Sequence, residues 1–119
     1  MKATAAASAP HERTVDMKSI SVDDLAALGS GVPIIDVREK EEYAEAFVPG
    51  TRNVPLSRFQ QSMGDIPAGR TVYIMCASGG RSSRATAALT EAGYDAVNVM
   101  GGITEWYRNG HPVTYQAGR

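Results

Sequence analysis

A chain of 119 residues fits one compact domain with a single hydrophobic core. Hydrophobic residues make up 43% and charged residues 21%, and the net charge of −1 provides no basic field that would attract nucleic acid or an anionic membrane. No apolar run approaches the ~18 residues that a transmembrane helix needs. The single cysteine cannot form an intramolecular disulfide, so nothing requires an oxidising compartment, and we expect a cytoplasmic location.

The chain divides into one domain and two short ends. Residues 1–16 show no periodicity and are predicted to be a flexible N-terminal tail, because their longest apolar run is far shorter than the ~7–15 residues of a secretory signal. The domain is expected over residues 17–115, followed by a C-terminal tail over residues 116–119.

The first half of the domain alternates short strands with helices. Ser21 caps the first helix, and Asp24 follows three residues later as its partner in a capping box. Leu25 and Leu28 supply the buried side of this helix, and Gly29 ends it. In chain order, the other elements expected here are a strand over 18–20, a strand over 32–37, a charged helix over 38–46 with Tyr43 facing inward, a strand over 51–56 and a weak helix over 57–63.

The second half continues the alternation. We expect a buried strand over 71–75, a helix over 82–92, a strand over 96–100 and a helix over 103–109 with Trp106 on its inner face. Strands that alternate with helices indicate an α/β fold. The sequence therefore predicts a central, mostly parallel five-stranded sheet with helices on both faces.

The only cysteine, Cys76, comes directly after the predicted strand over 71–75. A helix N-terminus or a nearby cation lowers the pKa of a cysteine thiol, and here both follow closely, with Arg81 supplying the cation. Gly79 and Gly80 permit the backbone torsions of a concave nest of N–H groups. We therefore expect an accessible thiolate at the carboxyl edge of the sheet, where open α/β sheets bind ligands. A small, inert core cysteine is the competing interpretation.

The spacing between Cys76 and Arg81 discriminates among thiol chemistries. Cysteine-dependent phosphatases place five residues between the cysteine and the arginine, in a loop that encircles a tetrahedral phosphate. Here four residues intervene, and the smaller bowl fits one extra sulfur atom on the cysteine, which is a persulfide.

Four segments, taken in order, resemble the single-domain rhodaneses, a family of thiosulfate sulfurtransferase-like proteins. Any one of the segments would be weak, but four in the family's order across roughly residues 17–114 are specific. They are Ile35-Asp36-Val37-Arg38 with Glu42-Tyr43, then Pro49-Gly50-Thr51-Arg52-Asn53-Val54-Pro55, then Cys76-Ala77-Ser78-Gly79-Gly80-Arg81-Ser82, and finally Gly101-Gly102-Ile103 with Trp106 and Gly110-His111-Pro112-Val113.

The resemblance implies a rhodanese-like fold and a sulfur-transfer mechanism. Cys76 would take the outer sulfur of a donor such as thiosulfate as a persulfide, and an acceptor such as cyanide, a small thiol or a protein thiol would remove it. Arg81 would help to bind the anionic donor, and no metal or organic cofactor is implied. The residues expected to bind the substrate and the persulfide are Ala77, Ser78, Gly79, Gly80, Arg81 and Ser82.

Two residues near the end of the strand over 32–37 are expected to support the loop. Asp36 either accepts N–H bonds from the catalytic loop or caps the following helix, and a structural role is favoured. Arg38 is expected to form an ion pair with Glu42 at i,i+4 spacing. The chain departs from the family's usual Gly-His-Ile with Ala46-Phe47-Val48, so we expect the loop packing there to differ.

Two other function classes compete with a sulfur-transfer enzyme. One is a non-catalytic persulfide carrier or sulfide-sensing module that binds a partner protein, since it needs the same loop. The other is a phosphatase or arsenate reductase on a related fold, which the short loop argues against.

Overall fold

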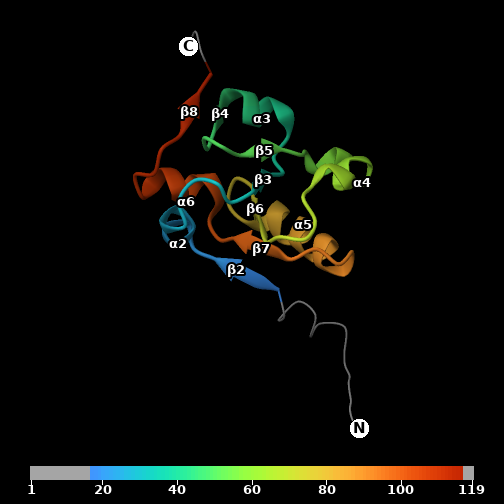
Figure 1. Ribbon diagram of the computed structural model, residues 1–119. Coiled ribbons are helices and arrows are strands. Elements are labelled where there is room, and N and C mark those ends of the chain that lie inside the picture. The colour runs from blue at the N-terminus through green and yellow to red at the C-terminus, as the bar shows by residue number, and fades with distance from the viewer. Residues whose placement is uncertain (1–16, 117–119) are drawn as a thin grey trace.

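The computed structural model describes residues 17–116, so the predicted tail over 1–16 and most of the one over 116–119 lie outside the described residues. Its elements follow the alternation expected from the sequence (Figure 1). In chain order they are β2 (Lys18–Ile20), α2 (Val22–Ala27), β3 (Ile34–Asp36), α3 (Lys40–Glu45), β4 (Ala46–Phe47), β5 (Arg52–Asn53), η1 (Leu56–Arg58), α4 (Phe59–Ser62), η2 (Met63–Asp65), β6 (Val72–Met75), α5 (Gly80–Glu91), β7 (Ala96–Val99), α6 (Gly102–Arg108) and β8 (Thr114–Tyr115).

The five-stranded sheet has the order β2-β7-β6-β3-β5, and every neighbouring pair is parallel. This confirms the predicted α/β class. Because all strands run in one direction, their carboxyl ends share one edge, and Asp36 at the end of β3 pairs with Met75 at the end of β6. Cys76 is the next residue along the chain, so the edge predicted to carry the site is the one where these strands end.

Two cores lie on opposite faces of the sheet, which confirms that helices cover both faces. One cluster includes Ile74, Phe59 from α4 and Leu89 from α5. The other joins Met75 to Leu25 from α2 and to Trp106 from α6. Figure 1 shows α2 and α6 on one side of the sheet and α4 and α5 on the other. The alternation of neighbouring β6 residues between the two clusters is the period-two pattern of a strand buried on both faces.

The Ser21 cap predicted for α2 is confirmed, but one of the two residues predicted to supply its buried side is not buried. The backbone N–H of Asp24 donates to Ser21 Oγ at 3.0 Å, and Gly29 has the left-handed torsion, φ 82°, expected just after the helix. Leu28, predicted to be buried, is 46% exposed. The helix ends at Ala27, so Leu28 lies in the turn and not on the buried face.

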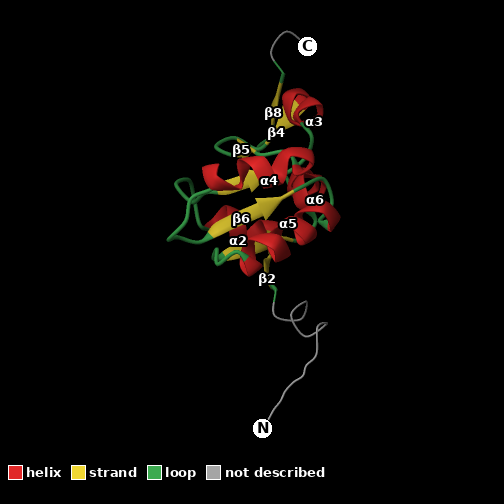
Figure 2. Ribbon diagram, turned by 90° about the vertical axis from the view of Figure 1, so that its right-hand side faces the viewer, coloured by secondary structure: helices red, strands yellow, loops and turns green. Residues whose placement is uncertain are grey.

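A two-stranded antiparallel ribbon of β4 and β8 was not predicted. Phe47, at the position that departs from the family pattern, pairs with Thr114 in this ribbon. Its ring stacks on that of Tyr43 with the centroids 4.8 Å apart. Figure 2 shows α3, β4 and β8 gathered at one end of the molecule. Phe47 thus joins the C-terminal segment, through its backbone, to α3, through its ring.

Within residues 17–116, no helix is long and apolar enough to cross a membrane.

Candidate active site

The predicted loop connects β6 to α5. Strand β6 ends at Met75, Cys76 follows it, and α5 begins at Gly80, two residues before the predicted start. Gly79 is the residue before the helix and has φ 118°, a torsion that L-residues with side chains rarely adopt. This glycine turns the chain sharply enough to start α5 early, so Gly80 and Arg81 lie in the first helical turn.

The thiol of Cys76 receives hydrogen bonds from this turn. The backbone N–H of Gly79 lies 3.0 Å from Cys76 Sγ. Burial opposes ionisation, but hydrogen bonds from the Ser82 hydroxyl and from the backbone N–H groups of Ser82, Gly79 and Ser78 outweigh it, so the pKa of the thiol lies below its ordinary value. The loop therefore favours the thiolate.

Cys76 is more deeply placed than the sequence suggested. The residue is only 1% exposed, so the prediction of an accessible thiolate is wrong. The loop residues Ser78 and Gly80 are exposed, while Cys76 belongs to the buried core cluster that includes Val72 and Ile74. The sulfur thus lies at the floor of the loop, because the backbone that donates hydrogen bonds to it also covers it.

The start of α6 holds the loop from the side. The N–H of Ile103 donates to the Cys76 carbonyl at 2.9 Å, and that of Thr104 donates to the Ala77 carbonyl at 3.0 Å. A Cβ on Gly102, which has φ 57°, would overlap both carbonyl oxygens. The two loop carbonyls thus accept hydrogen bonds from α6. The N–H groups of the turn face the sulfur instead and are available to it.

Ser82 links the loop to the sheet. Its side chain is fully buried, and its Oγ lies 2.6 Å from Asn98 Oδ1 on β7 and 3.2 Å from the Gly79 carbonyl. The hydroxyl has only one proton to donate. Asn98 Oδ1, the Gly79 carbonyl and the sulfur of Cys76 therefore compete for it.

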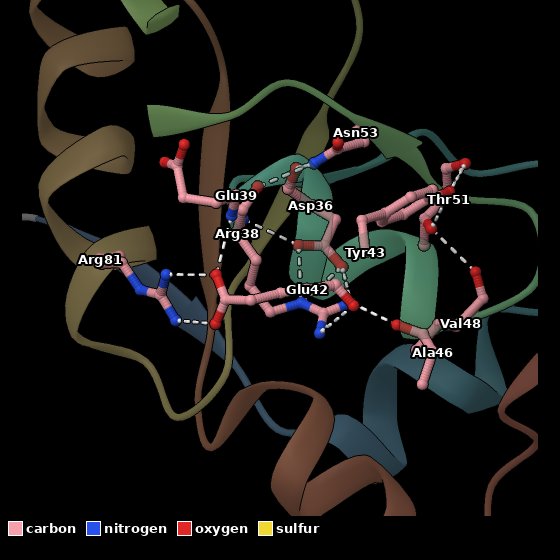
Figure 3. Close-up of polar contacts among 10 residues, drawn as sticks. All are labelled: Asp36, Arg38, Glu39, Glu42, Tyr43, Ala46, Val48, Thr51, Asn53 and Arg81. Atoms are coloured by element: carbon pink, nitrogen blue, oxygen red, sulfur yellow. Dashed lines mark hydrogen bonds and ion pairs between the residues drawn. The ribbon is translucent and has the colours of Figure 1, made fainter. Parts of the chain in front are cut away.

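Arg81 does not lie free at the mouth of the loop. Its two terminal nitrogens donate to the two carboxylate oxygens of Glu42 on α3, with Nη1–Oε1 at 2.7 Å and Nη2–Oε2 at 3.0 Å (Figure 3). The hydrogen bond from Arg81 is the main reason that the pKa of Glu42 falls to about 2. The pair is thus charged on both sides over the whole neutral pH range.

The predicted ion pair of Arg38 and Glu42 is wrong, because each has another partner. Arg38 Nη2 lies 2.9 Å from Asp36 Oδ2, and Nε of Arg38 contacts both carboxylate oxygens of Asp36. Only the backbone carbonyl of Glu42 accepts from Arg38, at 3.4 Å. Asp36 lies at the end of a buried strand, two residues before Arg38. Its carboxylate binds the Arg38 guanidinium, which is therefore not available to the carboxylate of Glu42 at i,i+4 spacing.

Asp36 takes the structural role that the sequence favoured. It accepts from the backbone N–H of Arg38 at 2.9 Å as well as from the guanidinium, and it is fully buried. Arg38 also donates to the Ala46 carbonyl at 2.7 Å, after the end of α3. Together the two residues hold both ends of α3, which carries Glu42 to the loop (Figure 3).

Three contributors to the site were not assigned roles from the sequence: Glu42 as the partner of Arg81, Gly102 as a close neighbour of Cys76, and Asn98 as the partner of Ser82. The Gly101-Gly102 pair was visible in the sequence, and two adjacent glycines that precede a helix signal a close approach of backbone. No local sequence pattern indicates the roles of Glu42 and Asn98, because their partners are 39 and 16 positions away in the chain.

The described residues contain no group of three or more His, Cys, Asp and Glu side chains that could hold a metal ion.

Comparison with known proteins agrees with this geometry. The family model for the rhodanese-like domain matches residues 21–109. A sulfurtransferase from Allochromatium vinosum is 35% identical over 104 residues, which is 87% of this chain and 97% of that protein. A chloroplastic thiosulfate sulfurtransferase from Arabidopsis thaliana is 32% identical, over 71% of this chain and 81% of that protein. The crystal structure of a rhodanese-related protein from Thermoplasma volcanium superposes with a TM-score of 0.78 at 30% identity, covering 82% of this chain and 97% of the other.

Proposed function

Because this chain belongs to the rhodanese-like domain family, in which its relatives are named sulfurtransferases, we propose that it transfers sulfane sulfur through a persulfide on Cys76. Thiosulfate is the proposed donor, and cyanide or a thiol is the proposed acceptor. The name of the plant relative supports this choice of donor.

The observation that carries the proposal is the lowered pKa of the Cys76 thiol within a turn of N–H donors. Nucleophilic attack requires the thiolate, which the hydrogen bonds of the turn favour despite burial. Because Cys76 is 1% exposed, attack also requires the loop that covers the sulfur to move aside for the donor. A persulfide places its negative charge on the added sulfur, one bond further toward the mouth of the loop. The backbone N–H groups of the turn, from Ala77 to Ser82, are proposed to donate hydrogen bonds to this sulfur and so to stabilise its charge.

The reaction has two balanced steps. In the first, the Cys76 thiolate attacks the outer sulfur of thiosulfate, the sulfur–sulfur bond of the donor breaks, and sulfite leaves with the electron pair. In the second, the acceptor attacks the terminal sulfur of the persulfide, and the Cys76 thiolate is the leaving group. Cyanide becomes thiocyanate, and a thiol becomes a persulfide after it loses its proton.

Thiosulfate-dependent formation of thiocyanate from cyanide tests the proposal. Repeated turnover is expected for the unaltered chain, with parallel lines in double-reciprocal plots because the donor product leaves before the acceptor binds. Cys76→Ser removes the nucleophile and is expected to abolish the reaction. A chain that takes one sulfur per molecule and then stops would favour the carrier function, and hydrolysis of an aryl phosphate that depends on Cys76 would favour the phosphatase.

A further inference from the structure

We propose that Glu42 determines which sulfur donors the site accepts, by holding the guanidinium of Arg81 and so opposing the binding of small dianions such as thiosulfate. This inference rests on the proposed sulfur transfer and deepens it. It keeps thiosulfate as a donor that binds at a cost, and it assigns to the site a preference for donors that carry negative charge only on the sulfur to be transferred. Persulfides of uncharged thiols are donors of this class.

The first step of the argument is the geometry of the pair. Both terminal nitrogens of Arg81 point at the carboxylate of Glu42 in a parallel two-pronged arrangement, at 2.7 and 3.0 Å. This is the arrangement in which a guanidinium would bind two oxygens of a sulfonate or sulfate group. Glu42 therefore occupies the hydrogen-bonding face of Arg81 that an oxyanion donor would need.

The second step is that Glu42 is held firmly in this position. Its Oε1 also accepts from the backbone N–H of Glu39 at 2.8 Å, in the capping box that begins α3. Arg38 donates to the carbonyl of Glu42 itself and to that of Ala46, which follows the last residue of the helix. A dianion that competes for Arg81 must displace a carboxylate that the fold has already oriented.

The third step concerns charge. With its pKa lowered to about 2 by Arg81, Glu42 is ionised at neutral pH, and the formal charge of the pair is zero. The guanidinium of Arg38 is bound to the fully buried Asp36. An incoming dianion thus meets a carboxylate at the mouth and a cation that is already neutralised.

The fourth step is that the pair can open. The side chains of Arg81 and Glu42 are 32% and 39% exposed, so water can solvate both when they separate. A dianion therefore binds at a cost and is not excluded. A persulfide RSS⁻ needs only the N–H groups at the floor of the loop. The Cys76 thiolate attacks its terminal sulfur, the sulfur–sulfur bond of the donor breaks, and RS⁻ leaves and is protonated by solvent.

The experiment compares Glu42→Gln with Glu41→Gln. The amide that Glu42→Gln introduces keeps an oxygen for the Glu39 N–H but loses the charge that binds Arg81, whereas Glu41 is an exposed neighbour on the same helix turn. Both variants change the net charge equally.

For Glu42→Gln, kcat/KM for thiosulfate is expected to rise about tenfold, which is the effect of one charge-assisted hydrogen bond. The rise is expected mainly through a lower KM. With the persulfide of 2-mercaptoethanol as donor, kcat/KM is expected to stay within about twofold. Glu42→Asp keeps the charge and is expected to retain the weak use of thiosulfate.

A second measurement does not depend on sulfur transfer. Sulfate is used to protect Cys76 against iodoacetamide, and Glu42→Gln is expected to need about tenfold less sulfate than the unaltered chain or Glu41→Gln. Weaker protection in Glu42→Gln, or the same change in both variants, would overturn the role of Glu42. Protection as expected without any persulfide on Cys76 would instead overturn the proposed function and leave Glu42 as an anion-excluding residue.

Discussion

Gly102, at the start of α6, lies directly against the carbonyl oxygen of Cys76. A Cβ at this position would also lie 2.6 Å from the Ala77 carbonyl oxygen. The neighbouring N–H groups of Ile103 and Thr104 bind the same two carbonyls. The absence of a side chain at Gly102 thus allows α6 to hold the catalytic loop by its backbone, and it explains why a glycine begins this helix.

Gly102→Ala is expected to destabilise the protein by about 2–4 kcal/mol, because it adds backbone strain at φ 57° to an overlap with the loop. In the same variant the pH midpoint of Cys76 alkylation is expected to rise, because the loop must move and its hydrogen bonds to the thiolate are weakened. Gly64→Ala is the control, since Gly64 has no atom within 4 Å of an added Cβ. Urea unfolding and the pH profile of alkylation measure the two effects. Equal stability of both variants would contradict the close approach.

Ser82→Ala is expected to raise the pKa of Cys76. Burial already opposes ionisation, and the Ser82 hydroxyl is the largest contribution that lowers the pKa. The backbone N–H of Ser82 remains, so the midpoint should move part of the way toward that of an ordinary thiol, near 8.5. The rate of iodoacetamide alkylation as a function of pH gives the midpoint. Ser83→Ala is the matched control on the next residue, and an equal shift there would argue against a specific hydrogen bond.

Asp36→Ala is expected to cost about 3–5 kcal/mol of stability, because it leaves the guanidinium of Arg38 buried without its partner. Asp36 is fully buried and Arg38 is 6% exposed. Glu105→Ala is the comparison, since it removes an exposed carboxylate 3.7 Å from Arg108, and such pairs contribute at most about 1 kcal/mol. Chemical denaturation measures both. A loss for Asp36→Ala no larger than that for Glu105→Ala would contradict the buried pair.

The lowered pKa of Cys76 also predicts how stability depends on pH. The folded state releases the thiol proton at a lower pH than the unfolded state does, so this group contributes stability above the unfolded pKa and loses it as the pH falls through the folded one. The difference in unfolding free energy between the unaltered chain and Cys76→Ser is therefore expected to grow from acidic pH up to about pH 8.5. Urea titrations at several pH values measure this difference. A difference that stays constant with pH would mean that the fold does not favour the thiolate.

The sequence predicted those parts of the site that are contiguous in the chain. Cys76, the two glycines and Arg81 lie within six residues, and the strand before them and the helix after them have clear periodicity, so the loop and its position at the sheet edge followed from local pattern alone. The order of the strands in the sheet, β2-β7-β6-β3-β5, was not predicted from the sequence.

The contacts that sequence reasoning missed are those between distant elements. The i,i+4 spacing of Arg38 and Glu42 suggested one ion pair, but a buried carboxylate two residues before Arg38 offered a better partner, and the sheet brought Arg81 to Glu42 across 39 positions. The β4–β8 ribbon has two residues in each strand, which is too short for any alternation to signal. The depth of Cys76 likewise depends on how the loop closes over it, which spacing does not report. The cytoplasmic location, thiosulfate as the donor and cyanide or a thiol as the acceptor stay predictions.

The central claim is that Cys76 accepts a single sulfur atom as a persulfide. Mass spectrometry of the intact chain after brief treatment with thiosulfate tests it most directly, with Cys76→Ser treated alongside. The account predicts that the unaltered chain gains the mass of one sulfur atom, that cyanide removes this mass and releases thiocyanate, and that the serine variant gains nothing. An unchanged mass in a chain whose Cys76 is reduced and reactive toward iodoacetamide, with thiosulfate and with a small-molecule persulfide alike, would contradict it.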